Sequence, residues 1–217
     1  MHGVAVGGLK RAEVRRFCVS LLMLIAFPAS SLADDACGNP FENAFGPWDY
    51  RTATAANISV VERHHFTDGM ASLRPGQWPL GADFSYTLRV FPNHPQALLS
   101  LTRLALRDKS TWIPYMPYSV ECWFDRAARF APNDPIPPMI AGIYLARLGR
   151  TAEALAELDR SASLGDDDAN LNYNLGLGYL EAKKYDKAMA HARKAYAAGF
   201  PLPGLRDRLT KAGAWKE

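Results

Sequence analysis

The chain has 217 residues, of which 48% are hydrophobic and 22% charged, and its formal net charge is +3. The whole excess lies in the first 33 residues, which hold four basic residues and one acidic residue, so the remainder has 21 of each sign. A phosphate-binding surface needs a clustered basic excess, and we therefore expect no nucleic-acid binding. The remaining length of about 184 residues suffices for one domain with a continuous core.

Residues 1–33 have the three parts of a secretory signal. Arg15 and Arg16 close a basic region, and Phe17–Phe27 is an uncharged apolar run. Ser31-Leu32-Ala33 then offers small residues at the positions that a signal peptidase reads. We expect cleavage directly after this triplet.

An uncleaved membrane anchor is the alternative for this segment. Even when extended to Leu32, the apolar run is shorter than the roughly 20 residues that span hydrocarbon. A lipoprotein signal needs small apolar residues directly before a cysteine, whereas Cys37 follows Asp34-Asp35-Ala36. We expect a periplasmic or secreted chain with no lipid anchor and no stable membrane insertion after cleavage.

Two cysteines remain after cleavage, because Cys18 lies within the apolar run. An exported protein meets a compartment that permits disulfides, so the simplest expectation is a Cys37–Cys122 bond. It would close a loop of about 84 residues and stabilise the fold by roughly 4 to 5 kcal/mol in the chain-entropy model. The alternative is two separate thiols, with Cys122 buried in a helix and Cys37 loose.

A repeat appears when residues 135–168 are aligned over residues 169–202 without a gap. In this alignment small residues match small residues at positions where two antiparallel helices can approach closely only if one of them has a small side chain. The period is 34 residues. The matched pairs are Gly142 with Gly176, Leu145 with Tyr179, Ala154 with Ala188, Leu158 with Ala192 and Ser161 with Ala195.

The last unit resembles a tetratricopeptide repeat (TPR). The resemblance is carried by NLGLGY at Asn174–Tyr179, YDKA at Tyr185–Ala188, and Ala195, while Asn172 replaces the usual early tryptophan. Residues 135–168 resemble the same motif, with Gly149 in the inter-helix turn and Asp166 where the family usually ends on proline.

Two less regular units precede these repeats. In the unit 95–134, a first helix at His94–Arg107 and a second at Glu121–Ala127 are separated by an insertion, Asp108–Tyr118, which lengthens the family connection by about six residues. The unit 58–94 is degenerate. It pairs a segment at Asp83–Asn93 with a helix predicted over Ser59–Leu73, where Gly69 and several prolines disturb the pattern.

The two ends complete the predicted architecture. Residues 34–57 have no helical period and are interpreted as an extended arm on the first repeat, whereas residues 203–217 are interpreted as a C-terminal capping helix. The resemblance thus implies an all-α, right-handed TPR-type superhelical solenoid of about three to four helical hairpins, with the repeat domain at 58–202.

No residue pattern indicates catalysis, a metal or a cofactor. The chain has no nucleophile elbow and no phosphate-binding loop, and the Asp166–Asp168 run lacks the spacing of a calcium loop and favours helix capping instead. We expect no enzyme activity. The histidines, which we expect to be structural, are His64, His65, His94 and His191.

The resemblance also implies a groove formed by the first helices of successive units. Such a surface suits a peptide with apolar side chains and with backbone or carboxylate groups that need donors. The alternative is that Ile140 and Ile143 simply contact a neighbouring helix. The family's columns place these residues in the groove: Gln96, Leu99, Arg103, Met139, Ile143, Arg147, Asn170, Tyr173, Asn174, Leu177 and Glu181.

The insertion is a second possible binding surface. Its aromatic residues would mark a docking site if they are exposed, or would fill the irregular N-terminal units if they fold back. The leading function is therefore an exported adaptor that binds another polypeptide in an envelope-associated or secretion-related assembly. The alternatives are a homo-oligomer built through the repeat face and a hydrolase with a site near the N-terminal arm.

Overall fold

The computed structural model describes residues 1–3, 36–165 and 168–216, so the predicted cleavage site lies outside the described residues. Within these ranges the fold is all-α, with ten helices and no strand, which confirms the predicted class. No helix of the described residues is both long and apolar enough to cross a membrane. The helices are α2 (Ala55–His65), α3 (Asp68–Ala71), α4 (Leu80–Val90), α5 (Pro95–Asp108), α6 (Val120–Phe130), α7 (Ile136–Arg147), α8 (Thr151–Leu164), α9 (Ala169–Glu181), α10 (Tyr185–Ala197) and α11 (Gly204–Lys211).

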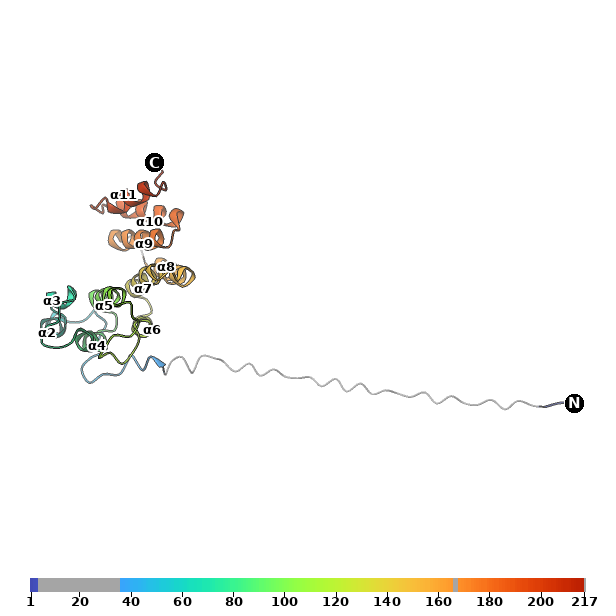
Figure 1. Ribbon diagram of the computed structural model, residues 1–217, viewed down its shortest axis with the longest axis horizontal. Coiled ribbons are helices and arrows are strands. Elements are labelled where there is room, and N and C mark those ends of the chain that lie inside the picture. The colour runs from blue at the N-terminus through green and yellow to red at the C-terminus, as the bar shows by residue number, and fades with distance from the viewer. Residues whose placement is uncertain (4–35, 166–167, 217) are drawn as a thin grey trace.

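The C-terminal half consists of two helical hairpins in the predicted register. Helix α10 begins at Tyr185, 34 residues after α8 begins at Thr151. The turns inside the hairpins also correspond, because Gly149 (φ 77°) and Lys183 (φ 58°) both adopt left-handed backbone. Figure 1 shows α9, α10 and α11 stacked at one end of the molecule, with α7 and α8 between them and α2–α6.

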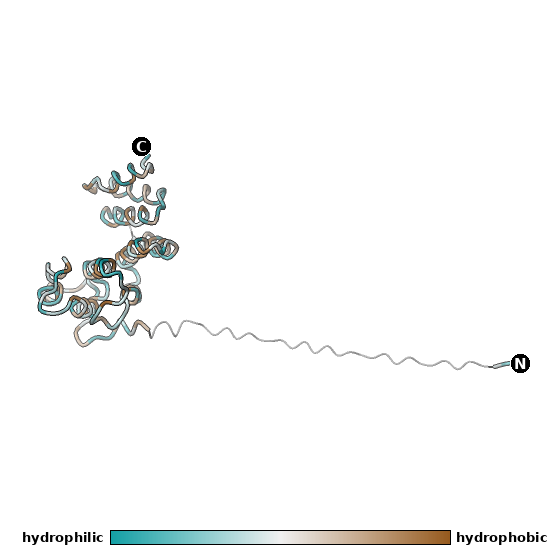
Figure 2. The backbone as a smooth tube through the Cα atoms, viewed as in Figure 1, coloured by the Kyte–Doolittle hydropathy of each residue, from teal (hydrophilic) through white to brown (hydrophobic). Residues whose placement is uncertain are grey.

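Small residues let these helices approach closely, as the repeat predicted. A Cβ atom at Gly142 would lie 2.6 Å from Leu158 Cγ, and one at Gly178 would lie 2.6 Å from Leu158 Cδ2. Leu158 therefore occupies space left by two glycines on α7 and α9. Leu205 of α11 contacts Gly176 in the same way, so α11 covers the last hairpin. Figure 2 shows apolar and polar residues interleaved along these helices.

The bounds predicted for the first helix of the N-terminal half are wrong. The segment predicted as Ser59–Leu73 forms two helices, because Phe66 leaves helical geometry and Thr67 starts α3 by accepting a hydrogen bond from Met70 N. The start is also earlier than predicted, since the Thr54 side chain accepts from Asn57 N and caps α2. Two local caps thus outweigh the apolar pattern that suggested one helix.

Residues 36–53 contain no long helix and run along the junction of α4 and α5. Trp48 N donates to Val90 O over 2.9 Å. The buried Asn93 side chain accepts from Tyr50 N and donates to two carboxylates, those of Asp49 and Asp134, each over 2.8 to 2.9 Å. This network joins the N-terminal segment to the connections that precede α5 and α7.

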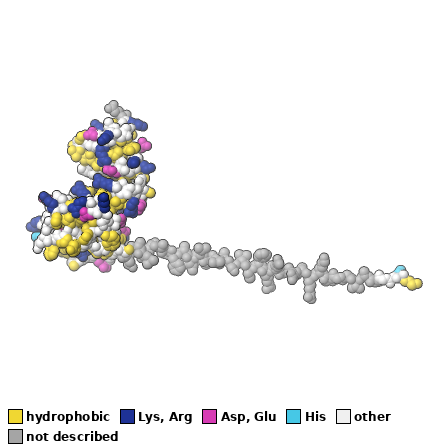
Figure 3. Space-filling model, viewed as in Figure 1, with side chains coloured by type: hydrophobic (Ala, Val, Ile, Leu, Met, Phe, Trp, Pro, Cys, Tyr) yellow, Lys and Arg dark blue, Asp and Glu magenta, His cyan; other side chains and the backbone are white. Residues whose placement is uncertain are grey.

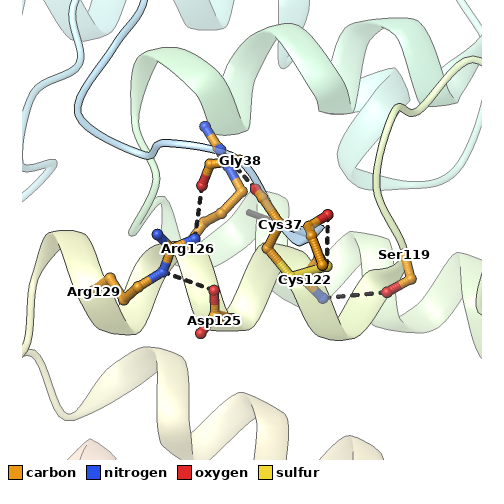
Figure 4. The surroundings of a disulfide bond; sticks show 8 residues. Cys37, Gly38, Ser119, Cys122, Asp125, Arg126 and Arg129 are labelled. Carbon is orange, nitrogen blue, oxygen red and sulfur yellow. Dashed lines mark hydrogen bonds and ion pairs between the residues drawn. A yellow bond between two sulfur atoms is a disulfide. The ribbon is translucent and has the colours of Figure 1, made fainter. Parts of the chain in front are cut away.

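A disulfide joins Cys37 to Cys122 on α6, which confirms the predicted pair. Two arginines of the same helix hold the backbone beside the bond (Figure 4). Arg126 donates to Cys37 O over 2.9 Å, and Arg129 donates to Gly38 O over 2.7 Å. The segment is thus attached to α6 by one covalent bond and two charge-assisted hydrogen bonds.

Arg126 is a buried cation that the sequence pattern did not reveal. Its side chain is 2% exposed, and its guanidinium lies 4.9 Å from the centre of the Tyr118 ring and 5.3 Å from that of Trp123. Burial lowers the pKa of this group. The two rings and the Cys37 carbonyl replace part of the hydration that the guanidinium loses.

His94 starts α5 and is fully buried. Its Nδ1 accepts a hydrogen bond from Ala97 N over 3.2 Å, as expected for a capping residue. Glu62 Oε1 lies 3.3 Å from Nε2 but outside hydrogen-bonding geometry, so Nε2 has no hydrogen-bond partner in the described part of the chain. Burial lowers the pKa of His94 from 6.5 to about 4.

This burial predicts a loss of stability in mild acid. The unfolded chain binds the proton at a higher pH than the folded chain, so stability falls as pH falls from about 6.5 towards about 4. We expect His94 to contribute about 2 kcal/mol of this loss between pH 7 and pH 4.5. Urea unfolding of the native protein and of His94→Asn, which keeps a capping oxygen, measures it. Equal pH dependence in the two proteins would contradict the prediction.

Candidate functional site

A cavity of about 480 Å³ lies between α5, α7 and α9 and brings together residues far apart in the sequence. Nine of the eleven predicted groove residues line it: Gln96, Leu99, Arg103, Met139, Ile143, Arg147, Asn174, Leu177 and Glu181. Ile136 and Ile140, which the family's groove columns also include, line the cavity as well. The structure adds residues that these columns do not include: Pro95, Thr102, Leu106, Tyr144 and Arg208.

The floor of the cavity is apolar and partly shared with the core. Met139 and Ile140 are 7% and 4% exposed, whereas Ile143 is half-buried. Ile143 also contacts α9, since a Cβ atom on Gly178 would lie 3.1 Å from its Cγ1. These isoleucines therefore lie among the packed helices and also line the cavity.

The rim carries three arginines and one carboxylate. Arg103 and Arg147 are exposed, and neither makes an ion pair or hydrogen bond through its side chain within the described residues. Glu181 is paired with Arg208, which donates to it over 3.0 Å. The rim therefore has a positive charge and two guanidinium groups available to a ligand. On the face shown in Figure 3, basic side chains gather where the two halves of the molecule meet.

Arg208 belongs to the site although the repeat pattern did not place it there. It lies on α11, after the last repeat, and reaches Glu181 across 27 residues of sequence. Leu205 and Leu209 are fully buried and orient α11 on the last hairpin. In the sequence, Leu205, Leu209 and Trp215 form an apolar stripe that predicts how α11 packs but not which of the neighbouring basic residues reaches the groove.

The other two predicted residues lie outside the cavity lining. Tyr173 stacks on Phe200, with ring centroids 4.0 Å apart, and its hydroxyl faces the start of α11 at Gly204. The Asn170 carbonyl accepts from Asn174 Nδ2 over 2.8 Å. Tyr173, which the family columns assign to the groove, thus packs against the turn after α10 instead.

Three of the four histidines predicted to be structural make side-chain contacts inside the fold, whereas His64 is exposed. His65 pairs with Asp83 over 3.0 Å and stacks on Tyr86, whereas His191 contacts the Asn172 side chain over 2.8 Å. Nowhere in the described residues do three histidine, cysteine or acidic side chains group to hold a metal ion. Asp168 caps α9 by accepting from Leu171 N over 2.7 Å, which confirms the capping expected of the acidic run, while residues 166–167 lie outside the described residues.

The insertion divides its apolar side chains between the core and the surface. Ile113 and Met116 are buried and pack in the main core, whereas Trp112 and Tyr115 are 62% and 72% exposed. A Cβ atom at Gly81 would collide with the Pro114 carbonyl oxygen, so the loop lies directly against α4. The insertion therefore folds back in part and leaves two aromatic side chains exposed.

No protein-family model, curated protein or solved structure matches the chain. The TPR resemblance accordingly rests on the sequence columns and on the 34-residue spacing of the helices. Any function assigned to the cavity rests on the side chains that line it.

Proposed function

We propose that the protein is an exported adaptor of the TPR type that binds an extended polypeptide segment in the cavity between α5, α7 and α9. The single observation that carries the proposal is the composition of this cavity, in which two arginines without an ion-pair partner among the described residues border an apolar floor contributed by three helices. The periodic helical hairpins and the glycine contacts of Leu158 support the TPR assignment. The disulfide supports a periplasmic or secreted location, since such bonds persist in oxidising compartments.

The lining defines the chemistry of the bound segment. Leu99, Ile143 and Leu177 offer apolar surface to aliphatic or aromatic side chains, which gain by leaving water. Arg103 and Arg147 offer planar guanidinium groups that bind carboxylates through paired hydrogen bonds. The expected ligand is therefore a polypeptide segment that combines apolar side chains with at least one acidic residue.

Binding of a defined peptide tests the proposal. An apolar-acidic peptide of about ten residues should bind the native protein, and Arg103→Ala or Arg147→Ala should each raise the Kd about tenfold, the loss of one charge-assisted contact. Ile143→Lys should abolish binding, because it places an ammonium on the apolar floor. Fluorescence anisotropy gives the Kd, and circular dichroism confirms that each variant remains folded.

The matched control is Lys194→Ala, which removes an exposed cation of α10 that does not line the cavity. It should leave the Kd unchanged. Equal binding of a peptide in which lysine replaces the acidic residues would contradict the proposed recognition, as would unchanged binding in both arginine variants.

A further inference from the structure

A second cavity, of about 370 Å³, lies between α6, α7 and α8 and has the opposite charge. It uses another face of α7, because Leu145 is two residues beyond Ile143 and so points about 200° away around the helix. Its floor is formed by Phe124, Ala141, Tyr144 and Leu145, each 8% exposed or less. This cavity plays no part in the adaptor site proposed above.

Carboxylates outnumber cations around this second cavity. Glu121 and Asp125 come from α6 and Glu153 and Glu157 from α8, whereas the lining contains two arginines, Arg150 and Arg160. Asp125 is paired with Arg129, which donates to it over 2.8 Å. Even when Arg129 is counted with the lining, one negative charge remains in excess.

Arg150 is already paired with two of these carboxylates. It donates to Glu121 over 2.9 Å and to Glu153 through two nitrogens over 2.6 and 2.8 Å. Its single positive charge is therefore shared between Glu121 and Glu153.

Glu157 is the carboxylate that lacks a strong partner. Its nearest cation, Arg160, lies 3.6 Å away, and no hydrogen bond to its side chain is found in the described part of the chain. Its side chain is only 32% exposed, and burial raises its pKa. A ligand cation beside Glu157 would supply the hydrogen-bond donors that the protein does not.

The cation that fits is organic rather than metallic. No three carboxylates or other metal-binding side chains of the described residues converge on one point. A guanidinium or ammonium on an aliphatic stem instead matches acidic groups spread around an apolar floor, because the stem covers Phe124 and Leu145 while the charge reaches Glu157.

We propose that the cavity between α6, α7 and α8 binds an arginine side chain of a partner polypeptide, with Glu157 as the carboxylate that pairs with it. The protein would then have two recognition sites on opposite faces of α7. The groove takes the acidic-apolar segment, and this cavity takes a basic residue. The second site stands independently of the first, since the two share only Tyr144 in their linings.

Titration with two short peptides tests this site. The probe is acetyl-Gly-Ala-Arg-Ala-Gly-amide, and its control contains citrulline, the neutral analogue of arginine. In NMR spectra of the disulfide-bonded protein, the arginine peptide should shift the amide signals of Ala141, Leu145 and Glu157 and bind at least tenfold more tightly than the citrulline peptide. Glu157→Gln should remove most of this difference.

Two further variants separate the site from the groove and from a folding defect. Ala156→Phe, which fills the cavity without changing its charge, should also weaken arginine binding at least tenfold, whereas Glu181→Gln in the groove should not affect it. Equal binding of the citrulline peptide, unchanged binding by Glu157→Gln, or signal shifts confined to Ile143 and Leu177 would overturn the proposal. Tighter binding of spermidine than of the peptide would overturn the assignment to a polypeptide.

Discussion

Replacing both Cys37 and Cys122 by serine is expected to lower the free energy of unfolding by about 4 to 5 kcal/mol. The bond joins residues separated by 85 positions, and opening so long a loop releases the unfolded chain from a large entropic constraint. The midpoint of thermal unfolding should fall by roughly 10 to 15 °C. Calorimetry of the two proteins measures both quantities.

Reduction of the native protein provides the matched comparison. Dithiothreitol should reproduce the lower midpoint in the native protein and leave the double serine variant unchanged. Hydrogen exchange at the Trp48 amide, which donates to Val90 O, should accelerate in both cases, because the segment then loses its covalent bond to α6 and keeps only noncovalent contacts. A midpoint that does not respond to dithiothreitol would contradict the assigned role of the bond.

Leu158→Ala is expected to cost about 3 to 5 kcal/mol, the upper part of the range for a buried leucine. Leu158 is fully buried, and glycines face it from α7 and from α9, so at these two positions there is no side chain that could move into the space that its removal leaves. Removal of the leucine side chain should therefore weaken the packing of α8 on α7 within one hairpin and the contact of α8 with α9 of the next hairpin. Urea unfolding, with the slope compared between variants, measures the change.

Leu148→Ala serves as the control, since Leu148 is 41% exposed and lies in the turn between α7 and α8 of the same hairpin. It should change the free energy of unfolding by less than about 0.5 kcal/mol. A cost below about 1 kcal/mol for Leu158→Ala would show that the glycine contacts do not determine how the hairpins pack.

The C-terminal half of the fold could be predicted because its contacts recur. Gly142 and Gly176 fall in the same repeat column, and both face a leucine side chain too close to leave space for a Cβ atom. The structure of the N-terminal half instead depends on contacts that occur once and do not repeat along the sequence. The cap provided by Thr67 divides one predicted helix into two, and the buried Arg126 depends on rings and a carbonyl that only the folded chain brings together.

Most of the groove could be predicted for the same reason, because successive first helices present equivalent positions to one surface. Tyr173 lies outside the cavity because Phe200, in the turn after α10, stacks on it. Arg208 lines the cavity because α11 packs on α9 and directs it to Glu181. Both differences arise at the C-terminal end, where the chain departs from the repeat.

The second cavity gave no signal in the sequence. Its carboxylates lie on α6 and α8, where acidic residues ordinarily indicate solvated helix faces. Only the spatial arrangement shows that Arg150 is paired with Glu121 and Glu153, while Glu157 lacks a hydrogen-bond donor among the described residues.

Photo-crosslinking in cells, from a probe amino acid at Ile143 with a control probe at the exposed Tyr185, shows whether the cavity between α5, α7 and α9 binds a polypeptide. We expect one dominant polypeptide to be captured from Ile143 and not from Tyr185. Its crosslinked segment should contain apolar and acidic residues, and capture should be lost in Arg103→Ala/Arg147→Ala. Capture that persists in this double variant, or a crosslinked segment without acidic residues, would contradict the proposal that the cavity between α5, α7 and α9 binds such a polypeptide.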